Sequence, residues 1–165
     1  MTMKTAPLPI ALLIVIVLAG LSMARAQHDH QNADSHGTAG NDKDSREFVR
    51  FPNSLREHTL ANMRDHLLAL QEIQEAIGRG QEDVASRVAE QRLGMSSLGL
   101  HGAQEAAKHM PQGMKDAGTE MHHSASRFAV AAQNAGVTGD LKPAIEALAK
   151  VTAACVACHA SYRLQ

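Results

Sequence analysis

The chain has 165 residues, with 16 Lys and Arg, 17 Asp and Glu, and a formal net charge of −1. This length predicts one domain. Without the segment that we expect to be cleaved (below), 14 basic residues face 17 acidic ones, which excludes a strongly basic nucleic-acid-binding surface. Three Phe, one Tyr and no Trp predict a core that is largely aliphatic.

Residues 1–26 have the pattern of a secretory signal peptide. Lys4 is followed by an apolar run from Ile10 to Leu21 and by a small-residue cleavage site at Ala24 to Ala26. An uncleaved membrane anchor is the alternative, but the run is shorter than the roughly 20 residues that span a bilayer. We therefore expect cleavage after Ala26, export to the periplasm, and no membrane span in the mature protein.

Residues 27–52 predict a flexible polar leader. His28, His30 and His36 lie in it among aspartates, and a histidine-rich tract of this kind can bind Cu(II), Ni(II) or Zn(II) weakly. A solvated tail without bound metal is the interpretation that its composition favours.

A first helix is predicted from residue 53, with N-cap chemistry from Asn53 and Ser54 and an end at Gly78 and Gly80. Its apolar positions recur every three or four residues, at Leu60, Met63, Leu67, Leu70, Ile73 and Ile77. A second helix is predicted over residues 82–98. Residues 99–111 are predicted to be a connection with room for one helical turn.

Pro111 is predicted to open a third helix, whose buried side is marked by Met114, Met121, Phe128 and residues 130–132. A turn is predicted over residues 134–140, where Asp140 caps a fourth helix. The apolar positions of that helix are Leu141, Ile145, Leu148 and Val151. No stretch shows sustained strand alternation, so the sequence predicts an all-α protein, an antiparallel four-helix bundle over residues 53–165.

The chemistry-bearing motif is Cys155-Val156-Ala157-Cys158-His159, which is the C-x-x-C-H pattern of covalent haem attachment. Each thiol can bond one vinyl group of the porphyrin, and the histidine can reach the iron. A zinc site of three or four thiolates is excluded, because these are the only two cysteines. A thioredoxin-like pair lacks a preceding strand, and a plain disulfide would leave His159 unexplained.

The chain from about Asn53 to Leu164 resembles a class II c-type cytochrome, of the cytochrome c-prime family with its low-spin, Met-ligated relatives. The resemblance is carried by Cys155, Cys158, His159, Tyr162 and Arg163, and by the spacing of the helix before them. It implies one haem c on the last helix of a four-helix bundle, held by both cysteines, with His159 as the proximal iron ligand. It also places Arg163 one turn beyond His159 on the same helix face, beside a haem propionate, although a solvated charge is an equal alternative.

In the family, the distal residue comes from the first helix and is either Met, which gives an electron carrier, or an apolar residue, which leaves the iron open to small gases. At 100° per residue, Met63 lies near the centre of the apolar stripe, His66 about 60° away at its edge, and His58 towards solvent. We therefore predict Met63 as the distal iron ligand, with His66 as the runner-up. Ordinary core filling is the alternative for Met63.

His and Met residues also gather later in the chain, at His101, His109, Met110, Met114, Met121, His122 and His123. Met114 and Met121 share a helical face and are candidates to line the haem pocket. A Cu(I) site of Met and His is chemically allowed, but core methionines and surface histidines are the favoured interpretation.

The predicted function is periplasmic electron transfer by the haem iron, without substrate turnover and with other periplasmic redox proteins as partners. A haem protein that binds NO or CO is the first alternative, and a periplasmic His/Met metal-binding protein is the second. An enzyme is not expected, because His66 is the one conceivable distal acid or base and has no visible partner. Homodimers through the first two helices occur in the family, so a homodimer stays open.

Overall fold

The structure is a computed structural model that describes residues 44–164. The predicted signal peptide, its cleavage site after Ala26 and the leader histidines His28, His30 and His36 lie outside these residues.

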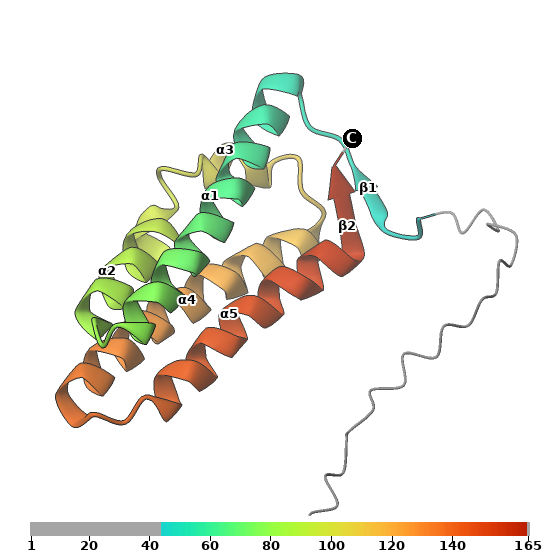
Figure 1. Ribbon diagram of the computed structural model, residues 1–165. Coiled ribbons are helices and arrows are strands. Elements are labelled where there is room, and N and C mark those ends of the chain that lie inside the picture. Colours follow the sequence, from blue (N-terminus) through green and yellow to red (C-terminus); the bar gives the residue numbers. More distant parts are fainter. Residues whose placement is uncertain (1–43, 165) are drawn as a thin grey trace, which may run out of the picture. The chain divides into compact units, whose positions relative to one another are not determined.

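The described part of the chain is mostly helical, and the prediction of an all-α protein is confirmed (Figure 1). Four longer helices run in the order α1, α2, α4 and α5, and one short strand lies at each end of the described chain. The elements are β1 (Glu47–Val49), α1 (Asn53–Gly78), α2 (Glu82–Arg92), the 3₁₀ helix η1 (Met95–Ser97), α3 (Ala103–Ala107), α4 (Gln112–Thr138), α5 (Lys142–Ser161) and β2 (Tyr162–Leu164).

The helix termini differ from the predicted ones in several places. The predicted side-chain cap at Asn53 and Ser54 is wrong, because the capping residue is Pro52 and its carbonyl accepts from the Arg56 N–H at 2.9 Å. At the other end, α4 continues through most of the predicted turn to Thr138. It stops at Gly139, whose φ of +76° is the left-handed conformation that glycine adopts without strain. Asp140 accepts a hydrogen bond from the Lys142 N–H at 3.0 Å, but the N-cap residue of α5 is Leu141, one position later than predicted.

The second helix ends earlier than predicted, at Arg92 instead of residue 98. The Glu90 carboxylate and the Ser126 hydroxyl lie against Gly94 so closely that a Cβ there would overlap both groups. Ser126, on α4, donates to Glu90 at 2.6 Å and accepts from the Met95 N–H at 3.0 Å. The Met95 N–H therefore bonds to α4 and not to a carbonyl of α2. The chain therefore changes to the 3₁₀ helix η1 at this point.

Helix α4 is central to the packing, because it contacts both α2 and α5, while α1 packs on α2. Small residues line these contacts and let the helix axes approach closely. Ala69, Ala85, Ala89, Ala125, Ala132 and Ala144 are all fully buried, around the larger side chains of Ile73, Leu93, Phe128 and Val151. Helices α1 and α5 are not packed on one another to any comparable extent.

Strands β1 and β2 pair in parallel, with Phe48 opposite Arg163 (Figure 1). A second apolar cluster joins β1 to the start of α4 through Val49, Phe51 and Met114. Two expectations are corrected here. Residues 47–49 belong to this strand and not to a polar leader, and Arg163 lies on β2, because α5 ends at Ser161 and Tyr162 is extended (φ −128°, ψ 150°).

Several positions predicted to be buried are exposed. Val130 is 57% exposed and Ile145 is 49% exposed, on the outer sides of α4 and α5. Leu67 on α1 is 69% exposed and borders the space between α1 and α5. Helix α5 is also long and apolar enough, by length and composition alone, to cross a membrane. This helix packs on α4 and also borders the space between α1 and α5, with Ala154, Cys155 and Cys158.

Phe128 provides a test of this packing. Because its ring is fully buried, Phe128→Ala is expected to lower the free energy of unfolding by about 3–5 kcal/mol. Val130→Ala, two residues along the same helix but largely exposed, is the matched control and is expected to change it by less than about 1 kcal/mol. Urea denaturation followed by circular dichroism measures both. Equal losses in the two variants would contradict this assignment of the core.

Candidate functional site

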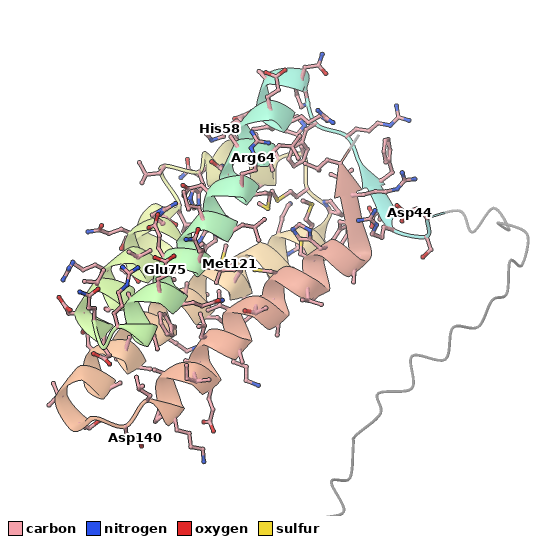
Figure 2. The ribbon with its side chains drawn as sticks, viewed as in Figure 1. Asp44, His58, Arg64, Glu75, Met121 and Asp140 are labelled. Atoms are coloured by element: carbon pink, nitrogen blue, oxygen red, sulfur yellow. The ribbon has the colours of Figure 1, made fainter. Side chains whose placement is uncertain are left out.

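A crevice lies between α1 and α5, where these helices do not pack directly. It consists of two adjoining cavities of about 250 and 210 Å³, which share Leu60, Met63, Cys158 and His159 in their walls. The larger cavity is mostly apolar and continues past Leu67, Leu70 and Met121 (Figure 2 shows Met121). The smaller cavity extends towards β2 and includes Met114. Met114 and Met121, the two methionines predicted to line the pocket, therefore both lie in the walls of the crevice.

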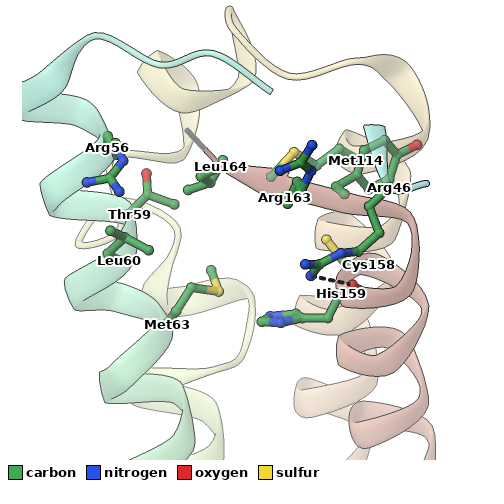
Figure 3. Close-up of a pocket in the computed structure, with 11 residues that line it drawn as sticks. Arg46, Arg56, Thr59, Leu60, Met63, Met114, Cys158, His159, Arg163 and Leu164 are labelled. Carbon is green, nitrogen blue, oxygen red and sulfur yellow. Dashed lines mark hydrogen bonds between the residues drawn. The ribbon is translucent and has the colours of Figure 1, made fainter. Parts of the chain in front are cut away.

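Met63 and His159 lie on opposite walls of the crevice. Figure 3 shows the thioether of Met63, on α1, and the imidazole of His159, on α5, pointing towards one another. The side chain of Met63 is half-buried, as is expected for a group at the edge of an apolar space. His58, which the helical periodicity turned towards solvent, is exposed. The structure therefore brings together the two residues that were predicted to act from opposite sides.

The two cysteines line the same wall as His159. Both are free and half-buried, and both border the larger cavity. Because they are three residues apart on α5, they share one helix face, and His159 follows on the next position. Burial raises the pKa of both thiols, so they are neutral at neutral pH. The wall thus presents two protonated thiols and one imidazole to the crevice.

Three arginines surround the smaller cavity. Arg56 reaches it from α1, Arg163 from β2 and Arg46 from the residue before β1 (Figure 3). The Nε atom of Arg56 is buried and has no hydrogen-bond partner, which is costly for a cationic group without a counter-charge. A ligand with a carboxylate at this end of the crevice would supply that counter-charge.

The other two arginines are held by β1 and its neighbours. The guanidinium of Arg46 donates two hydrogen bonds to Asp44, at 2.6 and 2.9 Å, and one to the backbone carbonyl of His159, at 3.4 Å. Arg163 lies 3.5 Å from the Asp44 carboxylate and stacks over the Phe48 ring, 4.9 Å from its centre. Hydrogen bonds from Arg46 hold the pKa of Asp44 well below its usual range, so that carboxylate stays charged. Contacts of Arg46 with His159 and of Asp44 with Arg163 therefore connect the end of α5 and β2 to the segment before α1.

His66, the alternative distal ligand, is 8% exposed and also borders the larger cavity. Its ring packs against two other imidazoles, with centroid distances of 4.6 Å to His101 and 6.2 Å to His122. Burial first, and then repulsion from these two rings, lowers the pKa of His66 to about 4. His66 is thus a neutral residue whose ring packs in a histidine cluster, and it borders the same cavity as His159.

Sequence reasoning missed three parts of this region: Arg46, Arg56 and the grouping of His66 with His101 and His122. Arg56 was within reach, because it lies seven residues before Met63 and so on the same helix face. Arg46 and the histidine grouping carry no local signal, since both depend on contacts between distant segments.

No protein-family model, curated protein or solved structure matches the chain. The interpretation of the crevice therefore depends on its own residues and on the C-x-x-C-H motif.

The buried His66 predicts a pH-dependent stability. Between pH 6.5, its ordinary pKa, and its folded-state pKa of about 4, the unfolded chain binds more protons than the folded chain. The free energy of unfolding is therefore expected to fall as the pH drops through this window, by about 3 kcal/mol from this group. In His66→Asn, urea denaturation in chelator-treated buffer should show a smaller loss. His58→Asn, at an exposed position, should retain the wild-type pH dependence, and an equal effect of both variants would contradict the assignment.

Proposed function

We propose that the protein is a c-type cytochrome that transfers single electrons in the periplasm and turns over no substrate. One observation carries the proposal: Met63 and His159 point towards one another across an apolar crevice whose wall also bears Cys155 and Cys158. The proposed cofactor is one haem c, bonded to both cysteines, with His159 as proximal and Met63 as distal iron ligand. The proposed partners are other periplasmic redox proteins.

The packing of the helices supports the fit of a haem at this position. Helix α1 packs on α2, α2 on α4, and α4 on α5, but the fourth contact, between α5 and α1, is replaced by the crevice. We propose that the fold is an antiparallel four-helix bundle and that the porphyrin fills this fourth contact. The exposed apolar side chain of Leu67, which lines the crevice, would then be covered.

The rim of the crevice suits the polar side of the same cofactor. A haem carries two propionate groups, and the smaller cavity has Arg46, Arg56 and Arg163 in its wall. Arg56 has a buried Nε without a partner, and a propionate is an anion that would satisfy it. This proposal keeps the predicted propionate role of Arg163 while placing it on β2 instead of α5.

When bound, a haem supplies reversible one-electron chemistry between ferric and ferrous iron. The protein's own residues have three tasks in this mechanism. His159 and Met63 would hold the iron from opposite walls of the crevice, and a thioether ligand would favour the reduced state and a high potential. The apolar walls around Leu60 and Leu70 exclude water, and the arginines balance negative charge at the rim.

Replacement of Met63 tests the distal ligand. Wild-type protein is expected to show a sharp low-spin α band when reduced and a weak Met–iron charge-transfer band when oxidised. Met63→Ala should yield a high-spin spectrum that binds CO rapidly. Met114→Leu, at another methionine of the same crevice, is the control and should keep the wild-type spectrum. An unchanged spectrum in Met63→Ala would exclude Met63, and rapid CO binding by wild-type protein would favour the gas-binding alternative.

Replacement of the cysteines tests the covalent attachment on which the proposal depends. The wild-type pigment should stay with the polypeptide in acidified organic solvent, whereas the double variant Cys155→Ala, Cys158→Ala should release any haem that it retains. The measurement is the absorbance of the two phases after extraction. Colourless wild-type protein, or pigment that is extracted from it, would overturn the proposal.

Arg56 provides a test of the rim. Loss of a positive charge near the propionates stabilises the ferric form, so Arg56→Gln is expected to lower the reduction potential by roughly tens of millivolts. Arg79→Gln removes the same charge at an exposed position at the far end of α1 and should leave the potential almost unchanged. Spectroelectrochemical titration measures both variants, and equal shifts would show that Arg56 does not act at the rim.

A further inference from the structure

Three histidines from distant parts of the chain meet beside the crevice. His66 comes from α1, His122 from α4, and His101 from the segment between η1 and α3. Their ring centroids are separated by 4.6, 5.5 and 6.2 Å. The position of His101 is fixed from α1, because the Asn62 side chain donates to the His101 carbonyl at 3.1 Å. Three segments are therefore held so that their imidazoles form one group.

The hydrogen bonds of the group determine which ring nitrogens are free. Nδ1 of His122 donates to the Leu93 carbonyl at 2.7 Å, which leaves its Nε2 with a lone pair. The Ser97 hydroxyl donates to the Gly94 carbonyl at 2.7 Å, so its oxygen is an acceptor for Nδ1 of His101 at 3.4 Å. His101 then also keeps its Nε2 lone pair. A carbonyl or hydroxyl on the second nitrogen is the usual support of a metal-binding histidine.

His66 completes the group with an unsatisfied atom. The residue is more than nine-tenths buried, and its Nε2 has no hydrogen-bond partner. Such an atom costs free energy unless something binds to it. Burial lowers the pKa of all three histidines, so the imidazoles are neutral at pH 7 and able to bind a metal.

We propose that His66, His101 and His122 bind one divalent transition-metal ion, such as Zn²⁺, with a fourth position open to water. With Zn–N bonds of about 2.0–2.1 Å, the ring centroids of two ligands are about 4.5–5.5 Å apart for angles of roughly 90–120°. Two of the three observed separations are in this range, and the third exceeds it by less than 1 Å.

The nitrogen atoms themselves do not yet converge, and within residues 44–164 no three His, Cys, Asp or Glu side chains already surround a metal position. The missing step is a reorientation of the His66 ring, whose Nε2 has no hydrogen-bond partner, while the Nδ1 hydrogen bonds of His101 and His122 stay in place. Rotation about the Cβ–Cγ bond of histidine is a soft torsion with broad minima, so this step is a small one. The ion would tie α1, α4 and the segment around His101 together, one turn of α1 away from Met63.

The test is Zn²⁺ binding to the full mature protein, measured by competition with a chelating dye. The leader histidines would contribute a background, so His28, His30 and His36 are replaced by Asn in every sample. The parent protein is expected to bind one Zn²⁺. His66→Asn, His101→Asn and His122→Asn should each weaken the binding by at least about 100-fold, because loss of an outer supporting group alone costs about 10–100-fold. His123→Asn, the exposed neighbour of His122, is the matched control and should bind like the parent.

Two further readouts keep the test decisive. Circular dichroism establishes that each variant is folded, and His101→Asn, at a half-exposed position, is the variant least affected by loss of packing. Zn²⁺ should raise the melting temperature of the parent and of His123→Asn, but not of the cluster variants. Absence of saturable binding, equal binding by the cluster variants, or equal loss in His123→Asn would overturn the proposal.

The visible spectrum separates this proposal from the one for haem. His66→Asn is expected to leave the axial ligands of the iron, and hence the spectrum, unchanged. A high-spin spectrum in this variant would assign His66 to the iron and would overturn the separate metal site. Zn²⁺ binding is measured independently of the pigment, so failure of the haem proposal would not itself remove the metal site.

Discussion

The structure depends on close packing of small side chains around α4. Alanines on α2, α4 and α5 bring these helices into direct contact, and Phe128 and Val151 fill the remaining space. Because α4 contacts α2 and α5 and α1 is attached through α2, the pair α1 and α5 is left without direct packing. The apolar crevice at that position is thus a consequence of how the other contacts are made. A core with larger residues on α4 would separate the helices differently and would lose the defined crevice.

The ends of the chain determine the chemistry of one side of this crevice. The pairing of β1 with β2 stops α5 at Ser161 and turns Arg163 towards Phe48 and Asp44. It also brings Arg46 to the carbonyl of His159. The negative charge of the Asp44 carboxylate holds both Arg46 and Arg163 in place. The proposed proximal histidine is therefore supported by a segment that lies before the first long helix.

How much of this was predictable from the sequence depended on whether the signal was local. The periodicity of α1 was correct in placing His58 outside, but wrong in placing Met63 at the centre of the buried face and His66 at its edge. His66 is buried together with Ala69 and Ile73, and Met63 is half-buried beside them. The motif at Cys155 to His159 was recognisable because its five residues are consecutive in the sequence. Residues 47–49 carried no strand signal, since their pairing partners lie more than a hundred residues later. The early end of α2 and the grouping of three histidines likewise depend on α4, which no local pattern at Gly94 or His101 could reveal.

Met63 and His66, the two candidates for the proposed distal position, have different surroundings on α1. Met63 is half-buried at an apolar space with His159 opposite, and no other polar group engages its sulfur. His66, about 60° around the helix, is enclosed by His101 and His122. Turning His66 towards His159 would break up that group and leave two buried imidazoles without their neighbour. A ligand exchange at the crevice would therefore disturb the histidine cluster, so the helix favours one residue for each site.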